Sequence, residues 1–169
     1  MQEITKVFKV YHLKELEEKI REKLIENEME IIQEDYLECF LYEDMEQRAR
    51  ELLREYFGDK AEINKIQYSL SYCQGDGAMI EFDLLYYNKE LKIRNYGNYC
   101  HAKSFIIDGD IDGVRYEKLC NKITDMNDEL TKYGYELIEN CSGREDAINA
   151  LNDHLFLKDG TFFTEIEDL

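Results

Sequence analysis

The chain has 169 residues, of which 44% are hydrophobic, so it can bury a core and is not a disordered segment. Its 38 acidic and 21 basic residues give a formal net charge of −17, which disfavours direct nucleic-acid or anionic-membrane binding and favours a basic protein partner. No apolar run is long enough to span a membrane and the N-terminus lacks a signal-peptide pattern, so we expect a cytoplasmic protein.

The N-terminal third predicts one strand and two amphipathic helices. Residues 4–11 are typical of a strand, and residues 13–32 carry apolar side chains at helical spacing. A second helix is expected over residues 34–57, ended by Gly58. Its expected buried face consists of Leu37, Leu41, Met45, Ala49, Leu52 and Tyr56.

A β-hairpin is predicted over residues 66–86. Apolar or aromatic residues alternate with polar ones on both sides of a glycine-rich turn. The parity of this alternation favours a three-residue loop ending at Gly77, which we expect to have a positive φ. The expected face-sharing pairs are Tyr72 with Ile80, Leu70 with Phe82 and Tyr68 with Leu84.

The hairpin motif also carries a resemblance. Residues 68–78, Tyr-Ser-Leu-Ser-Tyr-Cys-Gln-Gly-Asp-Gly-Ala, resemble the "SLSYSQGDG" signature of a family of small phage and mobile-element proteins. Residues 8–25, 96–104 and 146–160 are similar to the same family. The resemblance implies that the chain comes from a phage or an integrated element, and it brings no catalytic motif.

The second half predicts the remainder of an α+β fold. Short strands are expected near Leu91 and over residues 99–107, followed by a turn and a long helix with a heptad-like apolar stripe from Tyr116 to Leu137. Such a stripe is either a core-packing face, which we expect, or a dimer seam. A capping box of Ser142 and Glu145 predicts a fourth helix to about His154, and a terminal hairpin is expected over residues 155–163. The fold class is therefore α+β: an antiparallel sheet with a central β-hairpin packed against amphipathic helices, in a single domain of residues 1–169.

Asp108, Asp110 and Asp112 are the only residues with metal-ligand spacing. Alternate carboxylates before Gly113 match the opening of a calcium-binding loop, but Leu119 stands where the bidentate acid should be. We therefore expect no metal and no cofactor, and we expect Asp112 or Gly113 to lie near a helix start.

The cysteines give no catalytic pattern. Five cysteines without a Cys-x-x-Cys pair indicate reduced structural thiols. Cys100 and His101 are neighbours on an expected strand, so their side chains point to opposite faces and cannot form a nucleophile pair.

With no catalytic constellation, the leading hypothesis is a binding protein rather than an enzyme. We expect an anti-CRISPR-like inhibitor that blocks a basic nucleic-acid-binding surface of a host effector nuclease. The alternatives are a phage accessory or antitoxin-like protein-binding module, or a metal-dependent hydrolase that uses the three aspartates. The expected partner-binding residues are Glu43, Asp44, Glu51, Asp76, Asp108, Asp110 and Asp112.

Overall fold

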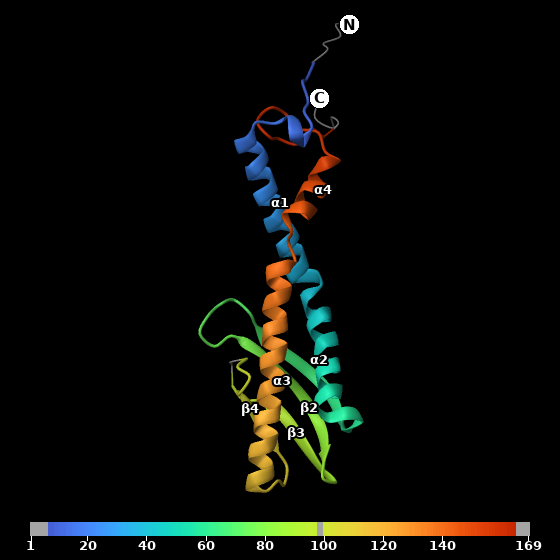
Figure 1. The fold of residues 1–169 in the computed structure, drawn as a ribbon, viewed down its shortest axis with the longest axis vertical. Helices are drawn as coiled ribbons and strands as arrows, with labels where there is room; N and C mark the ends of the chain where they lie inside the picture. Colours follow the sequence, from blue (N-terminus) through green and yellow to red (C-terminus); the bar gives the residue numbers. More distant parts are fainter. Residues whose placement is uncertain (1–6, 98–99, 165–169) are drawn as a thin grey trace, which may run out of the picture. The chain divides into compact units, whose positions relative to one another are not determined.

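The structure, a computed structural model, describes residues 7–97 and 100–164. These residues form four α-helices and a four-stranded antiparallel sheet, which confirms the predicted α+β class (Figure 1). The chain is divided into two compact units. Unit 1 combines Met1–Glu38 with Asn140–Leu169, and unit 2 is Cys39–Glu139. The single domain stays a prediction.

The sheet of unit 2 has the order β1-β2-β3-β4. Its strands are β1 (Ala61–Ser69), β2 (Gly77–Tyr86), β3 (Lys89–Asn95) and β4 (Phe105–Asp108). Along β2 the even-numbered residues Ala78, Ile80, Phe82 and Leu84 are all buried, as the alternation predicts. The strand expected over residues 99–107 is regular only from Phe105, and Tyr99 lies outside the described residues.

The hairpin is present, but the predicted register is wrong. Ile66 pairs with Ile80, so the loop is residues 70–76 rather than three residues. Tyr72, expected on the buried face, lies in this loop with φ 58° and 66% exposure. The register also shifts between Ile63 and Lys65, which places both Ile63 and Ile66 on the buried face despite their different parity.

Gly77 has the predicted positive φ, at 155°, but a different reason requires glycine there. A Cβ at this position would lie 2.4 Å from the backbone oxygen of Cys100. The segment after the third strand therefore approaches β2 so closely that only glycine fits.

The predicted boundary between the first two helices is also wrong. Helix α1 is Glu18–Cys39 and α2 is Leu41–Phe57, with the break at Phe40 rather than near residue 33. Residues 26–39 contain no proline or glycine to end a helix, so α1 continues. Residues Leu13–Glu15 form a separate 3-10 turn, and Gly58 ends α2 at φ 64° as expected.

Helices α2 and α3 (Gly113–Asn140) cover one face of the sheet (Figure 1). The ring centroids of Phe57 on α2 and Phe82 on β2 are 5.4 Å apart. A Cβ at Gly134 of α3 would lie 2.9 Å from the sulfur of Met45 on α2, so the two helices pack closely. The middle of the α3 stripe is buried here as a core face: Leu119, Ile123, Met126 and Leu130.

Unit 1 has its own small core of Leu13, Leu16, Ile25, Ala147, Leu151 and Phe156. Helix α4 is Arg144–Asn152, and Gly143 occupies its N-cap without a side-chain hydrogen bond, so the predicted capping box is wrong. The helix begins later than the box requires, which leaves the Ser142 side chain outside the cap. The terminal hairpin is confirmed by the hydrogen bonds from Leu157 N to Thr161 O and from Phe163 N to Leu155 O, both 2.8 Å.

The strand expected over residues 4–11 is reduced to one bridge in the part that is described. Tyr11 exchanges backbone hydrogen bonds of 2.8 and 2.9 Å with Phe156. Residues 7–10 have no regular structure, and residues 4–6 lie outside the described range.

Candidate functional site: acidic helix faces

Helix α2 carries charge on the face opposite its buried residues. Leu41, Met45, Ala49, Leu52 and Leu53 point into the core of unit 2. A shallow groove of about 430 Å³ runs along the solvent face and is lined by Glu43, Glu46, Gln47, Arg50, Glu51 and Arg54. Arginines therefore offset much of the acidic charge on this face.

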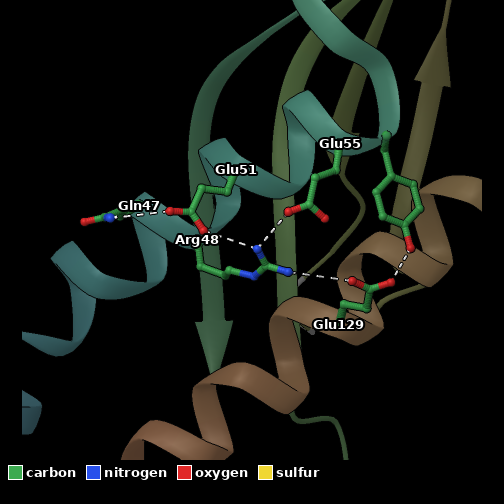
Figure 2. Close-up of polar contacts among 6 residues, drawn as sticks. Gln47, Arg48, Glu51, Glu55 and Glu129 are labelled. Atoms are coloured by element: carbon green, nitrogen blue, oxygen red, sulfur yellow. Dashed lines mark hydrogen bonds and ion pairs between the residues drawn. The ribbon is translucent and has the colours of Figure 1, made fainter.

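Arg48 joins three of the carboxylates on this surface. Its Nη1 atom donates to Glu51 at 3.2 Å and to Glu55 at 3.0 Å, and its Nη2 atom lies 3.9 Å from Glu129 on α3. Figure 2 shows the guanidinium between these three acids. Gln47 also donates to Glu51 at 3.4 Å. Glu51, an expected partner-binding residue, is thus already engaged inside the protein.

Glu129 is held from a second side by Tyr56. The Tyr56 hydroxyl donates to Glu129 at 2.5 Å. This hydrogen bond, with burial and the negative charges nearby, raises the pKa of Tyr56 to about 12, because ionising the phenol would place two anions together. The contact between α2 and α3 is therefore polar at its rim and apolar below it.

Glu43 and Asp44 lie in the first turn of α2. Glu43 is exposed and forms no hydrogen bond or ion pair with any described residue, whereas Asp44 is half-buried. Of the three acids expected on this helix, Glu43 is the one whose carboxylate is free to meet a partner.

Asp76 organises the hairpin loop from within. One of its oxygens accepts from the Cys73 backbone N–H at 2.8 Å and from the Tyr135 hydroxyl at 3.2 Å, and the other accepts from the Ser69 hydroxyl at 2.8 Å. The Cys73 N–H is the main reason that the pKa of Asp76 lies below its ordinary value. The Asp76 side chain therefore holds the loop in shape, and its expected contact with a partner stays a prediction.

Asp108, Asp110 and Asp112 do not converge. Asp110 forms an ion pair with Lys89 at 2.5 Å, which lowers its pKa. Asp112 accepts from the Arg115 backbone N–H at 3.2 Å and so begins α3, as expected. Within residues 7–97 and 100–164, no cluster of His, Cys, Asp or Glu could hold a metal ion. The absence of a metal stays a prediction.

A row of glutamates on α1 was missed from the sequence. Glu26, Glu30, Glu34 and Glu38 recur at every fourth residue, so they form one ridge of the helix, and all four are exposed. None of them has a hydrogen bond or an ion pair with a described residue. We call these four residues the α1 acidic row. The i, i+4 spacing of these glutamates is visible in the sequence, so the α1 acidic row could have been identified without the structure.

Asn127 is a second residue that pattern reasoning missed. It is the one polar side chain among the described residues that is buried as deeply as the core. Its oxygen accepts from the Ile80 backbone N–H and its nitrogen donates to the Ala102 oxygen, both at 3.1 Å. A polar residue four positions after Ile123, on the apolar face of a helix, is the signal that could have found it.

Other properties of the chain bear on the kind of protein it is. None of the described helices combines the length and the apolar character needed to cross a membrane. Residues 24–47 contain nine acidic residues and no lysine or arginine. Comparisons with protein-family models, with curated proteins and with solved structures found no match.

Proposed function

We propose that the protein is an acidic inhibitor that occupies a basic, nucleic-acid-binding surface of a host effector nuclease, in the manner of an anti-CRISPR protein. The observation that carries this proposal is the α1 acidic row, with four exposed and unpaired carboxylates on one helix ridge. The resemblance of the hairpin motif to phage and mobile-element proteins supports a host defence system as the setting.

The row presents four negative charges along one ridge of α1. Glu38 is twelve positions after Glu26, and a rise of about 1.5 Å per residue spreads the four charges over about 18 Å. Neighbouring carboxylates are therefore about 6 Å apart along the axis. A surface that binds a nucleic-acid backbone with spaced Lys and Arg side chains can pair with such a row.

The row is also costly to the isolated protein. Like charges at i, i+4 destabilise a helix by about 0.2–0.5 kcal/mol per pair, and the row contains three such pairs without an intervening base. A basic partner would remove this repulsion. Relief of the repulsion on binding would then add to the affinity of the complex.

Neutralising the row tests the proposal. A variant with Glu26, Glu30, Glu34 and Glu38 all changed to Gln should capture at least about tenfold less of the basic partner from host lysate than the unmodified chain does. The matched control changes four exposed, unpaired acids of unit 2 to their amides: Glu62, Glu90, Glu117 and Asp128. Both variants have a net charge of −13, so a difference between them reports position rather than total charge.

Stability measurements separate lost binding from lost folding. Because the repulsion is removed, the row variant should unfold at a urea concentration equal to or above that of the unmodified chain. Equal capture by the row variant and the unmodified chain would overturn the proposal, as would capture of partners without nucleic-acid-binding activity.

A further inference from the structure

A pocket of about 550 Å³ lies in unit 2 beside the β2–β3 turn, at the C-terminal end of α2. Ligand pockets in proteins are typically about 300–1,000 Å³. Four aromatic rings and two lysines contribute to its lining: Tyr56, Phe57, Tyr86, Tyr87, Lys60 and Lys122. Tyr56 is shared with the acidic surface described above, because its hydroxyl donates to Glu129, but the other five residues are not part of that surface.

The aromatic wall of the pocket is held in place. Tyr87 and Asn88 have φ values of 49° and 63°, which fix a tight two-residue turn between β2 and β3. The Tyr87 ring meets Tyr86 edge-on, with centroids 4.7 Å apart, and the Arg115 guanidinium lies 4.5 Å from its centroid. Tyr87 is nevertheless 64% exposed, so much of its ring is available to a ligand.

The two lysines supply positive charge that the protein does not neutralise. Lys122 donates to the backbone oxygen of Tyr56 and lies 4.8 Å from the centroid of Phe57. An ammonium group has three donors, so two remain for a ligand or water. Lys60 is exposed, and neither lysine forms an ion pair with a described residue.

We propose that this pocket binds a planar aromatic ring that carries an anionic group, the chemistry shared by nucleoside monophosphates and aromatic carboxylates. The ring stacks on the tyrosine wall, and the anion accepts hydrogen bonds from Lys60 and Lys122. The net charge of −17 does not prevent this, because salt screens charges beyond about 8 Å at physiological ionic strength. Three carboxylates place negative charge near the pocket residue Tyr56: Glu129, Asp125 and Glu55. Glu129 accepts from Tyr56 and lies near Arg48, and Glu55 is paired with Arg48.

A nitrogen-15 NMR titration of the whole chain tests the proposal and distinguishes the two sources. The two probes are AMP and 4-hydroxybenzoate. Adenosine, which lacks the anionic group, and inorganic phosphate, which lacks the aromatic ring, are the controls. We expect at least one aromatic anion to shift the backbone amides of Tyr87 and Lys122 and to bind about tenfold tighter than adenosine or phosphate. Failure of both aromatic anions to shift these amides, or phosphate binding as tightly as they do, would overturn it.

Two variants locate the binding. Lys122→Gln removes the charge, and Tyr87→Asn removes the ring while keeping a residue that tolerates positive φ. Each should weaken the aromatic anion about tenfold. Lys132→Gln, an exposed lysine on the same helix outside the pocket, should change binding by less than about twofold. Binding unchanged in both pocket variants would contradict the assignment.

Discussion

Asp76 has an environment that its position in the hairpin loop does not imply. An aspartate at a hairpin tip is ordinarily solvated, but this one receives a backbone N–H and hydroxyl groups from Ser69 and Tyr135. The exposed residues of the loop are therefore its neighbours, including Tyr72, whose ring lies 4.7 Å from that of Tyr135. A partner approaching this loop would meet Tyr72 before Asp76.

Replacing Asp76 by Asn should lower the urea midpoint of unfolding at about pH 7. The two carboxylate oxygens accept separately from the Cys73 N–H and the Ser69 hydroxyl. The amide keeps one acceptor oxygen and puts an NH2 donor in place of the other, so it cannot accept from both groups. Because the folded-state pKa of Asp76 is below its ordinary value, its stabilising contribution is present above pH 3.8 and is lost as the pH falls through the lowered pKa. The difference between the two proteins should therefore shrink in strong acid, and an equal difference at both pH values would contradict this role.

At the scale of elements, the alternation of apolar residues predicted which face of β2 is buried, but it did not predict how β2 pairs with β1. Alternation at Ile80, Phe82 and Leu84 correctly predicted the buried face of β2. The register could not be predicted, because it depends on the bonds that Asp76 makes across the loop and on the irregularity near Ile63. Parity counting assumes a regular ladder, and both features break that assumption.

The sequence predicted the acidic character of the candidate site but not which of its carboxylates are paired. Composition correctly indicated an acidic surface, and Glu43 is exposed as expected. Whether a carboxylate is free or engaged depends on contacts between distant segments, and Glu51 shows this because its Arg48 partner also reaches Glu129 on another helix. The α1 acidic row needed only i, i+4 counting, so it was available from the sequence.

Asn127 connects α3, β2 and the segment that precedes β4. Replacing it by Leu fills the space but leaves the Ile80 N–H and the Ala102 oxygen without partners. We expect a loss of about 2 kcal/mol or more in the free energy of unfolding, and faster hydrogen exchange at the Ile80 amide. The neighbouring change Asp128→Asn, at an exposed position, should stay within about 0.5 kcal/mol. A loss from Asn127→Leu as small as that of this control would show that the bridge is dispensable.

At the scale of the whole molecule, the charge is not evenly divided. Unit 1 has 18 acids and 8 bases, whereas the larger unit 2 has 20 acids and 13 bases. Ion pairs of unit 2 such as Arg48 with Glu55, Lys89 with Asp110 and Arg94 with Asp83 engage part of its acidic charge. The strongest unbalanced charge therefore lies in unit 1, which includes the α1 acidic row.

We propose that this charge takes the place of nucleic acid on a partner. The most direct measurement is the affinity of the captured partner for its own nucleic acid at increasing concentrations of this protein. Competition predicts that the apparent Kd for nucleic acid rises linearly with the protein concentration, that no ternary complex forms, and that added salt weakens the inhibition. A ternary complex in which partner, nucleic acid and this protein are bound together would contradict the account.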